Sequence, residues 1–166
     1  MNIVLRPLRI EDTSNIVKWR NRDDVKKNLF TQSDITEEQH LNYYHDFIET
    51  KKVYQFIIVA DGVDCGTTFL KNIDYINKRA EFGIFIGDPS FRGKGVGSFA
   101  TSKTIEIGFN ELFLNSIYLT VFSENKAAIN SYKKAGFKIV NSDQKHFLSN
   151  GSFVYVSMME INKPKK

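Results

Sequence analysis

The N-terminal third of the chain begins with a strand pattern and continues with helical patterns. Apolar and polar residues alternate over the first positions, as in a half-buried strand. Thr36 and Gln39 have the spacing of a capping box, in which each side chain bonds the backbone N–H of the other residue, so a helix is expected to begin there. The expected segments are a strand at 2–8, short helices at 12–19 and 24–29, and a longer helix at 36–49.

The middle of the chain has the pattern of an antiparallel meander. β-branched and aromatic residues dominate two runs that flank Asp61-Gly62, a dipeptide typical of hairpin turns. A third run of the same kind follows a few residues later. The pattern therefore predicts three consecutive strands, at 53–60, 63–73 and 79–86.

The last part of the chain mixes both periodicities. Helical spacing of apolar residues covers 95–112, and Gly136 provides a left-handed end for a second helix. The remaining expected segments are a strand at 116–122, the second helix at 125–135, and strands at 137–140 and 153–161. This order predicts an α/β or α+β fold, with a mixed sheet covered by helices. We expect one domain over residues 1–162, followed by a basic tail at 163–166.

Composition narrows the class of protein. Hydrophobic residues make up 42% and charged residues 25%, as in ordinary globular domains. No apolar run is long enough to cross a membrane, and the N-terminus has no secretory signal pattern, so we expect a cytoplasmic protein. Cys65 is the single cysteine, which excludes an intrachain disulfide and a Cys-rich zinc site. We therefore expect no metal.

The net charge of +4 arises mainly from the C-terminus. Without Lys163, Lys165 and Lys166 the formal charge is about +1. A nucleic-acid-binding face normally needs a denser basic cluster. We therefore expect no nucleic-acid partner and no membrane partner.

A glycine-rich loop lies between the third strand of the meander and the following helix. Alternate glycines let backbone N–H groups approach a ligand, and the helix start adds unpaired donors and partial positive charge. Together with two cations and a hydroxyl, this arrangement suits a pyrophosphate. The run is Arg92-Gly93-Lys94-Gly95-Val96-Gly97-Ser98.

The spacing of this loop excludes two common pyrophosphate sites. A dinucleotide-binding loop needs a third glycine where Ser98 stands, and its strand should open a βαβ unit. A P-loop needs its lysine after the last glycine, whereas Lys94 precedes two of the glycines. A glycine-rich turn without a ligand is the remaining alternative, although a turn alone requires neither three glycines nor two cations.

The loop resembles the acetyl-CoA signature of the GNAT superfamily of N-acetyltransferases. A second pattern of that family follows, at Asn125, Ala128, Tyr132, Lys134 and Gly136-Phe137. The resemblance covers nearly the whole chain. It implies a mostly antiparallel, seven-stranded sheet flanked by helices and splayed between the fourth and fifth strands.

The same resemblance implies how acetyl-CoA would be held. Backbone groups of Phe85 and Ile86 would lie along the pantetheine arm, and Asn125 would contact that arm from the opposite wall. The loop would bind the pyrophosphate. Arg92 and Lys94 would supply positive charge, and backbone N–H groups would donate hydrogen bonds from Gly93, Gly95, Val96, Gly97 and Ser98.

Acetyl transfer to an amine also needs a proton donor and a base. The resemblance makes Tyr132 the expected general acid for the departing thiolate; a core tyrosine is the alternative. Glu81 is the candidate base, although it could equally pair with Lys78 or Arg79 at a strand edge. Cys65 matches no nucleophile motif, so direct transfer is expected.

The amine acceptor is expected to bind to residues of the N-terminal third of the chain. Trp19-Arg20-Asn21 resembles an element of GNAT enzymes near RimJ/RimL, including UDP-amino-sugar N-acetyltransferases of the pseudaminic-acid type pathway. In that reading Arg20 faces the phosphate and aromatic residues such as Trp19 stack on the base or sugar. His40 lies on the helix expected to frame the acceptor, and a solvated histidine is its alternative.

Several acceptors remain open on this evidence. A UDP-linked amino sugar is favoured, and a protein N-terminus, as in ribosomal-protein alanine acetyltransferases, is the rival. A polyamine is less favoured because the region has no acidic cluster. A non-catalytic acyl-CoA-binding module is a further alternative, and the resemblance allows a homodimer through the last strands.

Overall fold

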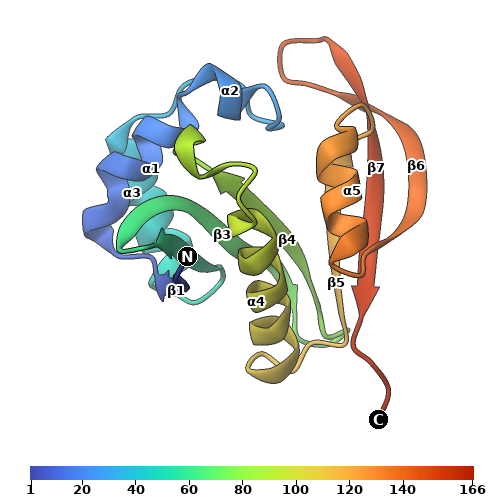
Figure 1. Cartoon of the computed structure of the whole chain (residues 1–166). Coiled ribbons are helices and arrows are strands. Elements are labelled where there is room, and N and C mark those ends of the chain that lie inside the picture. The colour runs from blue at the N-terminus through green and yellow to red at the C-terminus, as the bar shows by residue number, and fades with distance from the viewer.

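The computed structural model describes all residues, 1–166. Its core is a seven-stranded sheet in the order β1-β2-β3-β4-β5-β7-β6. All neighbouring strands are antiparallel except β4 and β5, which are parallel (Figure 1). The predicted fold class is therefore confirmed. The strands are β1 (Ile3–Pro7), β2 (Tyr54–Ala60), β3 (Val63–Asp74), β4 (Arg79–Ile86), β5 (Ser116–Phe122), β6 (Lys138–Phe147) and β7 (Phe153–Asn162).

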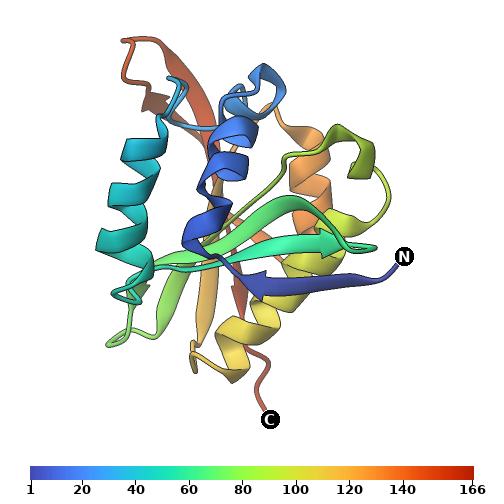
Figure 2. The same ribbon diagram turned by 90° about the vertical axis from the view of Figure 1, so that its left-hand side faces the viewer.

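Helices cover both faces of the sheet. The α-helices are α1 (Thr13–Arg20), α2 (Asp23–Lys26), α3 (Glu37–Tyr43), α4 (Val96–Asn110) and α5 (Lys126–Lys134). A π-helical turn, η2 (Tyr44–Ile48), continues α3, and short 3-10 turns lie at η1 (Ile10–Asp12) and η3 (Pro89–Phe91). Helices α1 and α3 lie over one face, and α4 and α5 lie over the other (Figure 2).

The alternation of side-chain direction along β2 explains why helices cover both faces of the sheet. Successive side chains of a strand point to opposite faces of a sheet. Ile57 packs with Ile16 and Trp19 of α1, whereas the next residue, Ile58, packs with Val96 and Ala100 of α4. Both isoleucines are fully buried. The near-continuous apolar run of β2 is thus the mark of a strand that is covered on both sides.

The two parallel strands separate soon after they pair. β4 contacts β5 only at Arg79, Ala80 and Glu81, which face Ser116, Ile117 and Tyr118. Beyond Glu81 the β5-facing edge of β4 has no strand partner. Unpaired strand edges present N–H and C=O groups to whatever enters beside them. The splay expected between the fourth and fifth strands is therefore present.

Local signals set several boundaries as expected. The capping box is formed, because Gln39 N donates to Thr36 Oγ1 at 3.1 Å and Thr36 N donates to Gln39 Oε1 at 2.9 Å. Asp61 and Gly62 both have positive φ, at 48° and 79°, as the turn between β2 and β3 requires. The helix predicted to continue to Glu49 instead changes to the π-helical η2 after Tyr43.

Strand β6 departs most from expectation. It runs from Lys138 to Phe147, where the sequence predicted a strand ending at Val140 followed by a polar loop. Every residue of β6 is exposed, so neither face imposes an alternating pattern. No helix of the structure combines the length and apolar character required to cross a membrane.

Candidate active site

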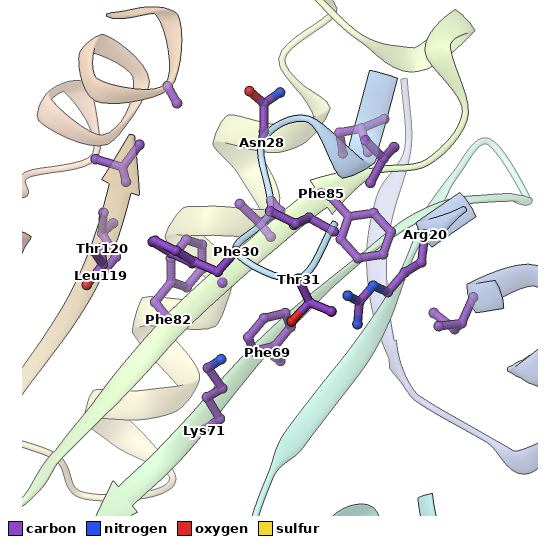
Figure 3. A pocket seen from close by; sticks show the side chains of 18 of the residues that line it. Arg20, Asn28, Phe30, Thr31, Phe69, Lys71, Phe82, Phe85, Leu119 and Thr120 are labelled. Carbon is purple, nitrogen blue, oxygen red and sulfur yellow. The ribbon is translucent and has the colours of Figure 1, made fainter. Parts of the chain in front are cut away.

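A large cavity begins where β4 and β5 separate. Its volume is about 830 Å³, and its walls come from the splayed strands, α1, α3, α5 and the segment between α2 and α3. Residues expected at the site from distant parts of the sequence meet on its wall, and Figure 3 labels Arg20 and Phe85 among them. These are Arg20, His40, Glu81, Phe85, Ile86, Arg92, Asn125 and Tyr132.

The glycine loop presents a continuous row of free backbone donors. Gly93 and Gly95 have φ of 71° and 82°, a region that side chains disfavour. No N–H group from Gly93 to Ser98 donates to an acceptor of the chain, and Gly95 gives α4 no side-chain cap. A Cβ placed on Gly93, Gly95 or Gly97 would meet only open space. The loop therefore fits a bound pyrophosphate.

Side chains of the loop divide between ligand and scaffold. Val96 is fully buried in the core beneath α4, so it offers only its backbone N–H. Lys94 and Ser98 are exposed and form no ion pair or side-chain hydrogen bond. Lys94 is therefore free to meet an anion.

Arg92 does not have the free charge expected of it. Its Nε and Nη2 donate to the Ile86 carbonyl at 3.1 and 2.8 Å, and its Nη1 donates to Asp24 Oδ2 at 2.6 Å. Arg92 and Asp24 thus tie the loop to the end of β4 and to α2. In the structure Arg92 therefore clamps the loop, and the Ile86 carbonyl accepts from the same guanidinium; a phosphate contact of Arg92 stays a prediction.

Helix α5 turns one face toward the cavity, as its spacing predicts. Asn125, Ala128 and Tyr132 line the wall together. The Asn125 side-chain oxygen accepts from Ala128 N at 3.2 Å and so caps α5. Its amide nitrogen forms no hydrogen bond within the chain and is the group left for a ligand.

Tyr132 is held by two aromatic neighbours. Its ring packs edge-on against Phe82 and Phe137, with ring centroids 6.0 and 5.9 Å away. Burial raises the pKa of Tyr132 to about 12, so the phenol is protonated at neutral pH. Its hydroxyl makes no hydrogen bond within the chain and can donate to a bound molecule.

Comparison with known proteins agrees with this geometry. The acetyltransferase (GNAT) domain model matches residues 2–138. The chain belongs to this family. The enzyme is therefore an acetyl-CoA-dependent N-acetyltransferase, and the free donors of the loop and the open edge of β4 fit the cofactor.

Named relatives differ in what they act on. The chain is 30% identical over 152 residues to the spermidine N(1)-acetyltransferase of Escherichia coli, covering 92% of this chain and 81% of that protein. It is 28% identical over 140 residues to acetyltransferase PseH of Campylobacter jejuni, covering 82% and 83%. A crystal structure of the Vibrio cholerae spermidine N-acetyltransferase with CoA and spermine superimposes with a TM-score of 0.89 at 27% identity, covering 96% and 95%. A further structure of that enzyme is dodecameric.

Glu81 lies at the base of the cavity, where β4 and β5 part. Its Oε2 accepts from Asn72 Nδ2 at 2.8 Å and lies 3.9 Å from Lys71 Nζ. The expected partners Lys78 and Arg79 form no ion pair with it, and Arg79 instead stacks on the Tyr118 ring at 4.3 Å. One carboxylate oxygen of Glu81 has no partner within the chain.

His40 is buried rather than solvated. It is 5% exposed, and its Nδ1 lies 2.9 Å from Thr13 Oγ1. Thr13 already donates to the Ile10 carbonyl at 2.8 Å, so the hydroxyl must accept from His40 Nδ1–H. This assigns the tautomer and leaves a lone pair on the buried, unpaired Nε2. Burial, and then the charge of Arg20, lower the pKa of His40, while Asp12 raises it.

Arg20 faces the cavity without a partner. Its guanidinium points into the cavity toward Thr31 (Figure 3), forms no hydrogen bond within the chain, and has a buried, unpaired Nε. Burial lowers the pKa of Arg20 from its ordinary value. Its Nε is buried without a hydrogen-bond partner, which costs free energy, and the cation has no anion beside it within the chain.

Trp19 does not reach the cavity. It is 6% exposed and packs with Leu8 and Ile57 in the core beneath α1. Its ring lies so close to Gly87 that a Cβ there would come within 2.1 Å of it. The structure therefore gives Trp19 a packing role, which fixes α1 and its neighbour Arg20 over the end of β4, and does not bring Trp19 to the cavity wall.

Sequence reasoning missed several wall residues. Phe69 and Lys71 of β3 face Gly83 and Glu81 of β4 and line the cavity beside them. Phe30 crosses the cavity mouth from the α2–α3 segment and packs edge-on against Phe122 of β5 at 5.2 Å (Figure 3). The alternation of β3 could have placed Phe69 and Lys71 on one face, but only the β3–β4 register brings them to Glu81.

Proposed function

We propose that the enzyme acetylates a primary amine carried by an anionic small molecule, and that a nucleotide-linked amino sugar is this acceptor. The unpaired guanidinium of Arg20 carries the proposal. A phosphate group accepts hydrogen bonds from the planar arginine fork in a bidentate manner. An anion beside Arg20 would also remove the cost of its buried, unpaired Nε.

The other charges of the cavity support an anionic acceptor. Lys27 and Arg20 line it without a carboxylate partner, and Lys71 lies 3.9 Å from Glu81, with which it forms a long ion pair. Only two carboxylates line it, and Asp24 is already paired with Arg22 and Arg92. The acceptor side is thus positive on balance, and the similarity to acetyltransferase PseH is compatible with this reading.

A polyamine is the second candidate, and the spermidine acetyltransferase relatives favour it. A polyamine keeps further ammonium groups besides the one that reacts, and those groups need carboxylates nearby. Glu81 alone offers a free carboxylate oxygen, and Arg20 and Lys71 would repel the cation. The charge of the cavity therefore disfavours this candidate, as it disfavours an acceptor that is itself a cationic N-terminus.

The chemical roles follow from what each residue faces. Acetyl-CoA supplies an activated acetyl thioester. Tyr132 holds a proton at a hydroxyl free to donate, and it acts as the general acid. Glu81 has a free carboxylate oxygen at the base of the cavity, and it accepts the proton of the amine. Cys65 lies outside the cavity in the core beneath α4, so the transfer is direct.

The role of Arg20 has a direct test. Arg20→Gln should raise the KM for a UDP-linked amino sugar by about tenfold or more, the loss of one charge-assisted contact, and leave the KM for acetyl-CoA unchanged. Arg20→Lys should recover part of the affinity. Lys138→Gln, which removes a cation from exposed β6, serves as the control. An Arg20→Gln enzyme with an unchanged KM for the acceptor would contradict the proposal. Wild-type protein that releases no thiol from acetyl-CoA with any amine would instead indicate a non-catalytic acyl-CoA-binding module.

The exposed last strands also suggest an assembly. β6 is an edge strand, and Phe147, Phe153 and Tyr155 of the β6–β7 hairpin are exposed. We propose that this hairpin joins two copies in a homodimer, as a dodecameric relative makes self-association plausible. Sedimentation velocity should give a dimer for the wild type and a monomer for Phe147→Ser/Phe153→Ser. A wild-type monomer at high concentration would contradict this.

A further inference from the structure

A second cavity adjoins the acceptor side of the first. Its volume is about 600 Å³, and it lies between the end of η2 and the outer end of β3. The two cavities share Tyr43 and Lys71 in their walls. A molecule whose reacting amine lies near Glu81 could therefore extend past Lys71 into the second cavity.

The charges of the second cavity are all of one sign. Lys51, Lys52 and Lys71 line it, and no carboxylate does. Lys51 and Lys52 are exposed and form no ion pair, while Lys71 is only 3.9 Å from Glu81. A concave wall with two unpaired cations, a third that has a long ion pair with Glu81, and no carboxylate of its own attracts a compact anion such as a diphosphate.

Aromatic rings lead from one cavity into the other. His40, Tyr43 and Phe47 follow one another along a single helical face, with ring centroids 6.2 and then 5.2 Å apart. Phe47 is 41% exposed, and Tyr75, in the turn after β3, is 58% exposed; both line the second cavity. Exposed aromatic rings on a cavity wall offer surfaces on which a planar base can stack.

Unusual backbone geometry places these groups. The π-helical bond from Glu49 N to the Tyr44 carbonyl at 3.0 Å follows α3 directly, and such turns are frequent at functional sites. Lys52 N and Val53 N both donate to the Phe47 carbonyl at 3.0 Å. Lys51 has a φ of 57°, which a residue with a side chain rarely adopts. The chain thus turns sharply at the point where Phe47, Lys51 and Lys52 meet the cavity.

We propose that the second cavity binds the nucleoside diphosphate part of the acceptor. Arg20 contacts the sugar-side phosphate from the first cavity, Lys51, Lys52 and Lys71 hold the remainder of the diphosphate, and Phe47 and Tyr75 contact the base. This inference rests on the proposed function, because it assumes that the amine is carried on a nucleotide-linked sugar. It adds a separate subsite, which lies beyond Arg20 and Glu81 and selects the nucleotide.

Binding of UDP to the CoA-saturated protein tests the subsite without turnover. Saturation with CoA keeps UDP out of the glycine loop. Calorimetry should show UDP binding to the wild type, and about a tenfold or larger loss in Lys51→Ala/Lys52→Ala with an unchanged affinity for CoA. Lys165→Ala/Lys166→Ala removes the same charge from the tail and should bind UDP as the wild type does.

A second variant separates the base from the phosphates. Tyr75→Ala should weaken UDP binding but leave the binding of inorganic pyrophosphate unchanged, because only the base is stacked. UDP affinity that is equal in the wild type and in Lys51→Ala/Lys52→Ala would overturn the subsite, as would wild-type protein that does not bind UDP.

Outcomes for the subsite and for the proposed function are distinguishable. If UDP-linked amino sugars are acetylated but UDP affinity does not depend on Lys51 and Lys52, the subsite is wrong and the proposed function stands. If UDP binds through these lysines but no nucleotide-linked amine accepts an acetyl group, the second cavity is a nucleotide site but not a subsite for the acceptor, and the proposed acceptor is wrong.

Discussion

Tyr132 combines an aromatic packing role with a free hydroxyl. Tyr132→Phe removes only the hydroxyl and keeps the ring between Phe82 and Phe137. We expect kcat to fall by about 10²- to 10⁴-fold, the usual range for a general acid, while the affinity for acetyl-CoA is unchanged. Steady-state kinetics and calorimetry measure both. Full turnover in the Phe variant would rule out the role.

The same residue restricts the pH profile. Because the pKa of Tyr132 is raised to about 12, its deprotonation should not lower kcat below about pH 11. An alkaline decline that begins near neutral pH, and that disappears in Tyr132→Phe, would contradict this assignment.

His40 should make the stability of the enzyme depend on pH. Its pKa in the folded state is lowered by burial and by Arg20, whereas an unfolded histidine titrates near pH 6.5. Below about pH 6.5 the unfolded chain therefore takes up a proton that the folded chain does not. The free energy of unfolding should fall with decreasing pH, by at most about 1.4 kcal/mol per pH unit from this group.

Urea unfolding at pH 7.5 and 5.5 measures this effect. His40→Gln should lose less stability between the two pH values than the wild type does. His45→Gln replaces a half-exposed histidine on the same helical segment and serves as the control. Equal pH dependence in the wild type and His40→Gln would mean that the buried imidazole does not titrate as its surroundings require.

Single residues were predictable from sequence where a short spacing defines the chemistry. Gly93 and Gly95 have the positive φ that their pattern allows, and Tyr132 lines the cavity, while their roles stay predictions. The burial of Trp19 was not predictable, because it depends on contact with Gly87, far away in the chain. Lys71 was missed because its position beside Glu81 depends on strand register.

At the scale of elements, we propose that the loop and the start of α4 act as one anion site. Gly95→Ala would strain a residue at φ 82° and project a methyl group into the open space beside the free N–H groups. We expect stability to fall by about 1 kcal/mol and the affinity for CoA to fall by about tenfold or more. Thermal unfolding and calorimetry measure the two effects.

Gly62→Ala is the matched control for this loop. Gly62 has a φ of 79° and open space around it, but it lies in the β2–β3 turn, away from the site. The Gly62→Ala variant should lose about as much stability as Gly95→Ala and should bind CoA with the affinity of the wild type. Equal CoA affinity in Gly95→Ala and Gly62→Ala would show that the loop does not hold the cofactor.

The bounds of helices and strands with one buried face or a clear cap were predictable from the sequence, and the bounds of the others were not. The expected bounds of β4 and β5 agree with the structure because apolar runs and breaks define them. β6 extends to Phe147 without a buried face, so its pairing with β7 leaves no trace in the sequence pattern. The π-helical η2 keeps an ordinary helical composition and was expected to be α-helical.

For the whole molecule, the sheet brings two functions to one cavity. In our proposal the splayed β4 and β5 and α5 form the cofactor side, with Arg92 at the edge of the glycine loop, and α1, α3 and β3 form the acceptor side. The fold and the cofactor side follow from the sequence. The charge of the acceptor side does not, because it depends on which cations of distant segments remain unpaired in three dimensions.

The most direct measurement is the kcat/KM for acetyl transfer to a UDP-linked amino sugar relative to that for spermidine, followed by thiol release from acetyl-CoA. We expect the ratio to exceed about ten, because Arg20 and Lys71 attract the anion and repel the polycation, and to shrink as salt screens these charges. A kcat/KM for spermidine equal to or above that for the amino sugar would contradict an anionic acceptor.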